Sequence, residues 1–482
     1  MRSSNRGAEH VELDHLDWVE DGTPRRGAGR DRRSGERRRS TAAASPERRR
    51  STDRRASERR APGGGGDARG GRGPAPKRSA RRPPAATLAP GVPERRALML
   101  VTFLLVVYGL VMAYSASAAQ AYFEYGSSFY FFGRQLAWAV IGVGAMWLLS
   151  RVDYSWYRRA APVFAALALA ALVAVLVPGV GTSINGARRW LFIGGQGLQP
   201  SEFAKLAAVM LVAMLIVRRP RAVRTLGGFL VLIAVGIVPA ATLIMLQPDL
   251  GTTLVLVSGV VAVLVAAGAP IRYLTGFAVA GVLAVLTLIA VEPYRLDRLV
   301  TFFDPWKDPQ GSGFQATQSL ISIASGRVFG VGLGNSVQKF GFLPEQTTDM
   351  ITGIIGEELG LIGLLVLLAL YVALAWACFR IALMCKETFG KLLATGLTAI
   401  VIGQACINVG AALGLLPLTG VPLPLVSCGG TSMLVVLAGL GVLLNISTNR
   451  RSHIAVSAQR RDRSARRGGD GGAPPARARR RG

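Results

Sequence analysis

Two Asp-Pro dipeptides, which begin at Asp304 and Asp308, carry the first side chains with the potential for chemistry. Gly311 and Gly313 follow closely, and Pro and Gly at this spacing favour a rigid turn. Such a turn can hold one carboxylate in a fixed place, where it can take a proton from a reacting group. The same pattern is common in turns without a chemical role, so the case for a catalytic carboxylate here depends on other residues.

A second set of residues combines positive and negative charge. Glu202 and Lys205 lie three residues apart, so on a helix they share a face and can neutralise each other at membrane depth. Arg188 and Arg189 add positive charge shortly before them. Two interpretations follow: a structural ion pair with interfacial anchors, or a cationic pocket for a phosphate or pyrophosphate group.

Two polar interruptions fall between apolar stretches. In the first, residues 247–253, Asp249 is either the N-cap of the next helix or a participant in a site. The second, residues 416–432, is rich in Pro and Gly and contains Ser427. Because Pro and Gly break the helix where the chain re-enters the membrane, the freed backbone groups must face protein or a cavity.

Carboxylates also occur inside an apolar stretch. Glu357 and Glu358 are adjacent in a predicted span, so they must face protein, water or a partner cation. The polar run before them belongs to a segment of 60 residues, 292–351, that is too polar to span a membrane and too long for a simple connection. We expect this segment to form a structured lid or cleft wall.

Ten apolar runs must position these residues, each long enough to cross about 30 Å of hydrocarbon as a helix. Helices are favoured over barrel strands because the runs are continuously apolar and do not alternate. We predict an all-α polytopic membrane protein of about ten transmembrane helices. The runs cover approximately residues 98–116, 133–149, 160–177, 201–217, 227–246, 250–268, 272–291, 352–376, 392–413 and 425–446.

The Lys and Arg residues of the short loops predict the orientation of these helices. Cytoplasmic loops carry an excess of both residue types, so the side that bears them and both termini is predicted to be cytoplasmic. The polar sets described above then fall at the outer face, with the 292–351 segment as the large outer loop. The residues concerned are Arg151, Arg158, Arg159, Arg218, Arg219, Arg221, Arg224, Arg272, Arg380, Lys386 and Lys391.

The net charge of +28 comes mainly from the ends of the chain. Residues 1–97 carry 25 Lys and Arg against 13 Asp and Glu, and residues 450–482 carry 11 against 2. Few large apolar side chains accompany them, so these ends cannot bury enough surface to offset their ordering entropy. We therefore predict disordered basic cytoplasmic tails at 1–97 and 449–482 around a membrane domain at 98–448. The charge does not by itself predict nucleic-acid binding.

Composition and cysteine spacing exclude several other classes of protein. With 50% hydrophobic and 17% charged residues, the chain is too apolar for a soluble protein. The first apolar run begins near Leu98 after a long charged lead, which indicates a retained helix and not a signal peptide. The four cysteines have no metal-site spacing, and we expect no disulfide. They are Cys378, Cys385, Cys406 and Cys428.

Taken in order and with ten spans, the five polar runs resemble those of the SEDS family (shape, elongation, division and sporulation), polytopic glycosyltransferases that polymerise peptidoglycan from lipid II. The resemblance covers residues 98–448. Within the family, residues 305–309 (PWKDP), 334–339 (GNSVQK) and 416–420 (LPLTG) resemble the division branch, FtsW, more than the elongation branch, RodA. The long Arg-rich start is similar to that of actinobacterial members. Cys428 and Thr347 depart from the family pattern, which usually has Tyr and often His or Gln there.

The resemblance implies that Asp308 is the catalytic carboxylate. It would take the proton of a sugar hydroxyl that attacks the anomeric carbon of lipid II. Arg189 and Lys205, or a divalent cation such as Mg²⁺ or Mn²⁺, would offset the charge of the leaving pyrophosphate; no metal ligands are identified. The residues expected to bind substrate or pyrophosphate are Arg189, Glu202, Lys205, Asp249, Gln315, Gln318, Lys339, Glu345, Asp349, Glu358 and Ser427.

The chain has no domain that could crosslink peptides, so the expected partner is a class B penicillin-binding protein, a transpeptidase, together with other divisome proteins at the septal cell membrane. No nucleic acid is expected. Three alternatives stay open: a lipid II flippase or other transporter, an elongation-type polymerase, and a noncatalytic scaffold that recruits division proteins. Lack of an internal repeat, and polar residues gathered at one membrane face, favour the polymerase over the transporter.

Overall fold

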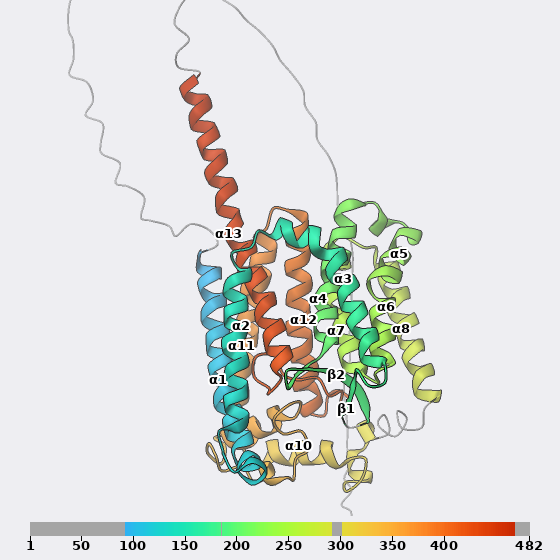
Figure 1. The fold of residues 1–482 in the computed structure, drawn as a ribbon, viewed down its shortest axis with the longest axis vertical. Helices are drawn as coiled ribbons and strands as arrows, with labels where there is room; N and C mark the ends of the chain where they lie inside the picture. The colour runs from blue at the N-terminus through green and yellow to red at the C-terminus, as the bar shows by residue number, and fades with distance from the viewer. Residues whose placement is uncertain (1–91, 185, 292–300, 468–482) are drawn as a thin grey trace, which may run out of the picture. The chain divides into compact units, whose positions relative to one another are not determined.

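A computed structural model describes residues 92–184, 186–291 and 301–467 (Figure 1). Most of the predicted N-terminal tail, residues 292–300 of the predicted outer loop and the last residues of the C-terminal tail lie outside this range. The described chain is mostly helical, as predicted. Its helices are α1 (Val92–Tyr125), α2 (Tyr130–Leu149), α3 (Tyr154–Leu176), α4 (Pro200–Arg218), α5 (Leu226–Gly236), α6 (Val238–Met245), α7 (Leu250–Ala266), α8 (Ile271–Val291), α10 (Phe314–Ser325), α11 (Ile351–Met384), α12 (Thr388–Ala412) and α13 (Gly430–Arg467), with the short 3-10 helices η1 (Ala222–Arg224), η2 (Pro305–Lys307) and η3 (Gln338–Phe340).

Within the described residues, seven helices are long and apolar enough to cross a membrane: α1 to α4 and α11 to α13. The pair α5 and α6 makes an eighth such span if taken together, although it is bent by 40°. Pro239, near the start of α6, cannot donate a backbone N–H, which explains the bend. α7 and the first part of α8, Ile271–Thr287, are apolar but shorter. All ten predicted runs fall on these elements.

The last predicted run starts too early. The predicted run begins at residue 425, whereas α13 begins at Gly430. Leu425 has a left-handed φ of 67°, and the Ser427 hydroxyl accepts the N–H of Leu423 at 2.8 Å. Hydropathy cannot detect such a backbone reversal, because the residues around it are apolar. At its other end α13 continues to Arg467; the predicted domain boundaries stay predictions.

A small antiparallel sheet lies between α3 and α4, where the sequence pattern predicts no strand. Its order is β1 (Thr182–Ile184), β2 (Ala187–Ile193) and β3 (Gln196–Leu198). Gly194 and Gly195 form the turn between β2 and β3, and both have positive φ, as a two-residue hairpin turn of this type requires. Thr431 fixes the sheet to the start of α13, because its hydroxyl donates to the Gly197 carbonyl at 3.1 Å.

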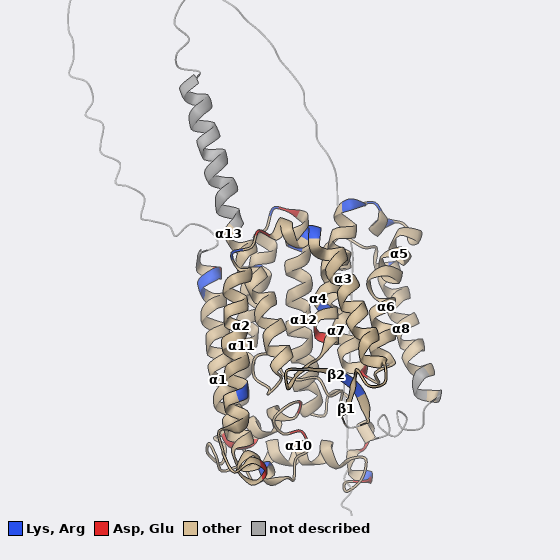
Figure 2. Cartoon of the chain, in the orientation of Figure 1, with Lys and Arg blue, Asp and Glu red and all other residues tan. Residues whose placement is uncertain are grey.

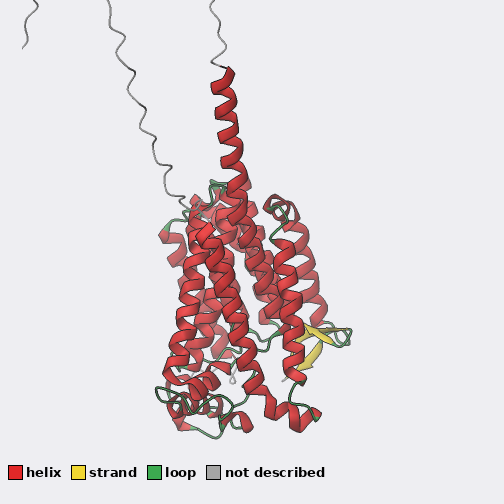
Figure 3. Cartoon of the chain, turned by 90° about the vertical axis from the view of Figure 1, so that its left-hand side faces the viewer, coloured by secondary structure: helices red, strands yellow, loops and turns green. Residues whose placement is uncertain are grey.

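The bundle has two ends. α1 begins and α13 leaves the bundle at one end, which we call the terminal end; α10 lies across the other, the loop end (Figure 1). Connections α2–α3, α4–α5 and α11–α12 lie at the terminal end and, together with the ends of the helices that flank them, carry most of the Arg and Lys residues used to predict orientation (Figure 2). Figure 3 shows the sheet towards the loop end, beside long helices that run side by side.

Small residues let the central helices α4, α7 and α12 pack closely. A Cβ at Gly396 of α12 would meet Val209 of α4 at 2.5 Å and Val263 of α7 at 2.6 Å. Close helix approach of this kind supplies packing contacts where lipid provides no hydrophobic drive. The central helices also bury polar side chains, among them Glu202, Lys205 and Gln404, and these need partners from the protein.

Candidate functional site

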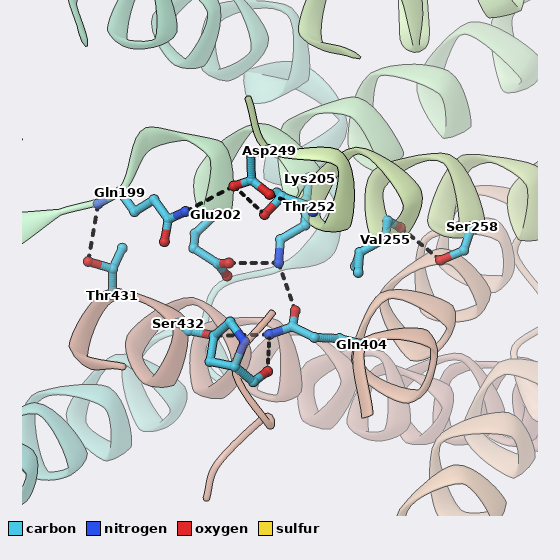
Figure 4. A network of polar contacts seen from close by, with 11 residues as sticks. Gln199, Glu202, Lys205, Asp249, Thr252, Val255, Ser258, Gln404, Thr431 and Ser432 are labelled. Carbon is cyan, nitrogen blue, oxygen red and sulfur yellow. Dashed lines mark hydrogen bonds and ion pairs between the residues drawn. The ribbon is translucent and has the colours of Figure 1, made fainter. Parts of the chain in front are cut away.

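Glu202 and Lys205 form the ion pair predicted on α4. The Lys205 ammonium lies 2.8 Å from Glu202 Oε1, and both side chains are 1% exposed. The same ammonium donates to Gln404 Oε1 of α12 at 2.7 Å, and Gln404 donates to the Ser432 hydroxyl of α13 (Figure 4). The two charges cancel inside the bundle, and the network ties three helices together.

Asp249 caps α7, which was one of its two predicted roles. Its Oδ1 accepts the N–H of Thr252 at 3.0 Å, and its Oδ2 accepts the Thr252 hydroxyl at 2.8 Å. Gln199, just before α4, donates to Oδ2 at 3.4 Å (Figure 4). The buried carboxylate thus receives three donors and holds the N-terminus of α7 close to the N-terminus of α4.

Arg189 reaches the same junction from β2. Its guanidinium donates to the backbone carbonyls of Gln247, at 2.9 Å, and Pro248. Both acceptors are neutral, so Arg189 keeps its full positive charge at the loop side of α6 and α7. Arg188, its neighbour, is exposed. The predicted cationic rim therefore has one anchored and one exposed arginine.

Glu358 of α11 meets a cation from the predicted outer loop. Lys339 Nζ lies 3.3 Å from Glu358 Oε1, and Glu358 is completely buried. Lys339 also donates to the Gly334 carbonyl, and the Ser115 hydroxyl of α1 donates to Glu358 Oε2. The prediction that this carboxylate must face protein or a partner cation is confirmed.

Glu357, the adjacent carboxylate, binds the same loop. Its Oε1 accepts the N–H of Val337 at 3.0 Å, and its Oε2 accepts the hydroxyls of Ser336 and Ser322, the latter at 3.3 Å. Residues 334–339 therefore wrap the two carboxylates of α11 with backbone, hydroxyl and ammonium donors. This part of the predicted lid is fixed to the bundle.

α11 is interrupted at Gly360, where φ is 66° and ψ is −161°. Residues 326–332 fill the break: the N–H groups of Val331 and Gly332 donate to the carbonyls of Glu357 and Glu358. In return, the N–H groups of the two residues after Gly360 donate to the carbonyls of residues 327 and 328. Backbone groups freed by the break thus find partners within the protein, as membrane depth demands.

Asp308 lies on an exposed turn at the start of the segment that leads into α10. Its Oδ1 accepts the N–H of Gly311 at 3.0 Å, and its Oδ2 accepts the N–H of Ser312 at 2.9 Å. A Cβ at Gly311 would stand 2.1 Å from Oδ2. The predicted rigid turn is therefore present and holds this carboxylate by two backbone donors.

α10 carries Gln315 and Gln318, both half-buried. Ser319, one residue further, donates its hydroxyl to the Ala412 carbonyl at the end of α12 at 2.9 Å. This contact fastens α10 to the bundle at the loop end.

Residues 413–429, which we call the Pro–Gly segment, connect α12 to α13 without regular structure. Side chains from several helices bind its backbone. Gln135 of α2 donates to the Ser427 carbonyl, Tyr371 of α11 to the Pro424 carbonyl, Asn408 to the Val421 carbonyl and Gln404 to the Pro422 carbonyl. The prediction that these freed groups face protein is confirmed.

Asp349 lies beside the Pro–Gly segment, since a Cβ on Gly420 would stand 3.7 Å from its Oδ2, and Glu345 shares a contact with it. The Thr348 hydroxyl is 2.8 Å from Glu345 Oε2 and 2.9 Å from Asp349 Oδ1. The Thr347 carbonyl accepts the N–H of Cys428 at 2.8 Å, so the two positions that depart from the family pattern touch. Partial burial raises the pKa of the Cys428 thiol, which favours its neutral, protonated form.

A groove of about 400 Å³ opens between the end of α1 and residues 339–347. Phe123 and Phe340 supply apolar surface, while Glu124 and Glu345 supply charge. Its mixed lining suits an amphipathic ligand. Of the predicted site residues, Lys339 and Glu345 line this groove.

The predicted residues therefore fall into separate networks: the α4 pair with the α7 cap, the lysine and carboxylates around α11, and the turn before α10. Sequence reasoning missed the buried amides of α12, Gln404 and Asn408, which bind the Pro–Gly segment. A signal was present, because the two lie four residues apart within an apolar run, and polar residues in such a run usually have a defined partner.

Sequence comparison matches residues 95–452 to the family model FTSW_RODA_SPOVE, described as "Cell cycle protein". The chain is similar to stage V sporulation protein E of Bacillus subtilis, with 42% identity over 356 residues, 73% of this chain and 97% of the relative. It is also 38% identical over 359 residues to a probable peptidoglycan glycosyltransferase FtsW of Geobacter metallireducens, covering 73% and 94%.

Two solved structures have a similar fold. One comes from work on the structural coordination of polymerization and crosslinking by a peptidoglycan synthase complex; it is 31% identical with a TM-score of 0.61, over 73% of this chain and 97% of the other. The other is the rod shape determining protein RodA of Thermus thermophilus, 28% identical with a TM-score of 0.55, over 73% and 96%.

Proposed function

The chain belongs to the FtsW/RodA/SpoVE family of cell cycle proteins, and from that premise we propose that it is a peptidoglycan glycosyltransferase of the division branch that polymerises lipid II into glycan strands. Relatives of that name match this chain over nearly their whole length. It is a multi-pass membrane protein, consistent with its apolar helices.

The observation that carries the proposed chemistry is the exposure and the hydrogen bonding of the Asp308 carboxylate. It is exposed at the loop end, it is oriented by two backbone N–H groups, and no ion pair joins it to another described residue. An ionised carboxylate has about four acceptor sites, so it can receive a substrate hydroxyl while it keeps both backbone donors. Asp308 is thus a fixed carboxylate with capacity left for a reactant.

In the proposed reaction, Asp308 takes the proton of a sugar hydroxyl on one lipid II molecule. The oxygen forms a new bond to the anomeric carbon of a second molecule, and the bond from that carbon to pyrophosphate breaks. Undecaprenyl pyrophosphate leaves with the electron pair. A single displacement without a covalent intermediate inverts the configuration, from an α-linked donor to a β-linked glycan.

Positive charge is needed where the pyrophosphate leaves. Arg189 is the better candidate of the two cations predicted for this role, because its described acceptors are neutral carbonyls. Lys205 is already neutralised by Glu202. An anion near the loop side of α6 and α7 would therefore meet uncompensated charge from Arg189.

A divalent cation is a further proposed component. Among the described residues no cluster of three or more His, Cys, Asp and Glu suits a metal ion, but Mg²⁺ is often held by one or two carboxylates and substrate phosphates. Glu345 and Asp349, whose carboxylates both contact the Thr348 hydroxyl, fit such a shared site. The ion would supply charge neutralisation for the pyrophosphate.

Polymerisation of purified lipid II by the purified chain tests the proposal. Asp308→Asn should lower the rate at least about 100-fold, because general-base catalysis commonly contributes that much, while expression and detergent-solubilised elution stay normal. Glycan output from Asp308→Asn equal to that of the parent would remove Asp308 from the mechanism. No polymer from the parent, with and without its partner, would reject the function itself.

Translocation of a lipid-linked precursor is the second candidate, and the broken helices favour it. Interrupted spans such as α11 and the α5–α6 pair are typical of transporters. In this chain, however, residues 326–332 occupy the α11 break, which ties it to the loop end. Movement of labelled lipid II across a vesicle membrane without polymer would support the transporter.

The proposed partner is a class B penicillin-binding protein, a transpeptidase, with other divisome proteins at the septum. Support comes from the similar structure of a polymerising and crosslinking synthase complex and from the division branch of the relatives. We further propose that the loop end is extracytoplasmic and both termini are cytoplasmic, since the arginines of the terminal-end connections follow the positive-inside pattern.

A further inference from the structure

Two buried amides of α12 bind consecutive carbonyls of the Pro–Gly segment. Asn408 Nδ2 donates to the Val421 carbonyl at 2.8 Å, and Gln404 Nε2 donates to the Pro422 carbonyl at 2.9 Å. The amides lie one helical turn apart, and neither side chain is more than 2% exposed. Each one therefore fixes one residue of the irregular segment to α12.

The two amides differ in what their oxygens accept. Asn408 Oδ1 accepts the Thr352 hydroxyl at 2.8 Å, whereas Gln404 Oε1 accepts the Lys205 ammonium at 2.7 Å (Figure 4). An ammonium can only donate, so the Gln404 oxygen must face it, and both N–H groups must point away. Those N–H groups meet the Pro422 carbonyl and the Ser432 hydroxyl.

The Gln404 amide therefore connects three groups: the Lys205 ammonium, the Pro422 carbonyl and the Ser432 hydroxyl. Lys205 has Glu202 as one acceptor and Gln404 as the other, so the glutamine decides where the ammonium sits relative to α12. Through its amide nitrogen the same residue decides where Pro422 sits. Neither Arg189 nor the α11 network contains a described link of this kind between a charge and the Pro–Gly segment.

We propose that Gln404 is a positioning residue that locks the Lys205 ammonium to the Pro–Gly segment, so that the cation and the segment are held in one arrangement during the reaction. The readout rests on the proposed glycosyltransferase function. Asn408 is the matched comparison, because it makes the same kind of carbonyl contact at Val421, and its other partners, the Thr352 hydroxyl and the Asp349 backbone carbonyl, are neutral groups.

The test is a double-mutant cycle on lipid II polymerisation by the full chain. Gln404→Leu and Asn408→Leu are each made alone and together with Lys205→Met. Gln404→Leu should lower kcat about 10- to 100-fold, as expected for a lost hydrogen bond to a charged group, with a smaller change in KM. In the Lys205→Met background, Gln404→Leu should lower kcat only as much as Asn408→Leu does. Asn408→Leu should lower kcat by the same factor with and without Lys205→Met.

Gln404→Glu provides a second variant if the leucine variant does not fold. It keeps an oxygen acceptor for Lys205 but gives up the N–H donors to Pro422 and Ser432, so it breaks the link on the segment side and should lower kcat by at least as much as Asn408→Leu does. Losses from Gln404→Leu and Lys205→Met that multiply, or a Gln404→Glu variant as active as the parent, would overturn the proposal.

An inactive parent would reject the proposed function and leave the coupling measurable. The same cycle is then read from the melting temperature in detergent. The proposal expects non-additive shifts for positions 205 and 404 and additive shifts for positions 205 and 408; additive shifts for both pairs would reject it.

Discussion

Lys339 and Glu358 meet 3.3 Å apart in a place where neither side chain is more than 7% exposed. One comes from the segment before α11 and the other from α11 itself, so the pair fastens the predicted lid to the bundle. Replacing Lys339 by Met would leave a buried carboxylate without its cation.

We expect Lys339→Met to destabilise the protein by about 3 to 5 kcal/mol, the usual result of breaking a buried ion pair by removing one partner. The melting temperature in detergent measures this. Lys339→Met with Glu358→Gln should recover part of the loss, since no charge is then left unpaired. Lys307→Met, at an exposed lysine, is the control and should change little.

Gly360→Ala tests the interruption of α11. A Cβ there would meet the Gly330 nitrogen at 2.4 Å, and the backbone has φ of 66°, so we expect a loss of about 2 kcal/mol or more. Gly276→Ala in α8 is the matched control: nothing lies within 4 Å of its Cβ, and alanine favours helix. An unchanged melting temperature for Gly360→Ala would mean that residues 326–332 do not fill the break.

Gly311→Ala separates the position of Asp308 from its presence. The added Cβ would displace the Asp308 carboxylate, and a misplaced catalytic group can cost about 100-fold in rate. The turn is exposed, so the melting temperature should change little. Ser312→Ala keeps the backbone donor to Asp308 and removes two hydroxyl contacts, one to Asp308 Oδ2 at 3.5 Å and one from Thr301 at 2.9 Å, so it should keep most of the rate. Equal activity of Gly311→Ala and the parent would argue against a fixed carboxylate.

Asp249→Asn distinguishes a helix cap from a charged participant. Asn caps a helix about as well as Asp, whereas Ala costs about 1 kcal/mol. If Asp249 acts as a cap, Asp249→Asn should retain both stability and polymerisation, and Asp249→Ala should lower the melting temperature. A variant Asp249→Asn that is stable but inactive would show that the charge itself takes part.

The spans and the local pairs could be predicted from sequence for a simple reason. Long apolar runs have one stable form in lipid, and Glu202 and Lys205 share a helix face by their spacing alone. Asp249 is followed at once by the helix that it caps. In each case the information lies within a few residues.

What escaped prediction depends on contacts between distant residues. The partner of Lys339 is fixed only when the segment before α11 folds back, and the carbonyls held by Gln404 belong to a stretch that hydropathy assigns partly to a helix. The sequence did not predict the sheet, although Gly194 and Gly195 mark its turn, because β1 and β3 have only 3 residues each and show no alternating pattern. The predicted roles of the site residues in substrate binding stay predictions.

The hydrogen bonds that fill the break in α11 have a mechanical consequence. Leu361 and Ile362 donate to the carbonyls of residues 327 and 328, so a rotation of α11 about its axis would strain these hydrogen bonds or move the chain just after α10. α10 begins directly after the turn that holds Asp308, and Gly313 donates to the Asp308 carbonyl. A path of hydrogen bonds and short chain segments thus connects α11, by way of α10, to the turn that holds the Asp308 carboxylate at the loop end.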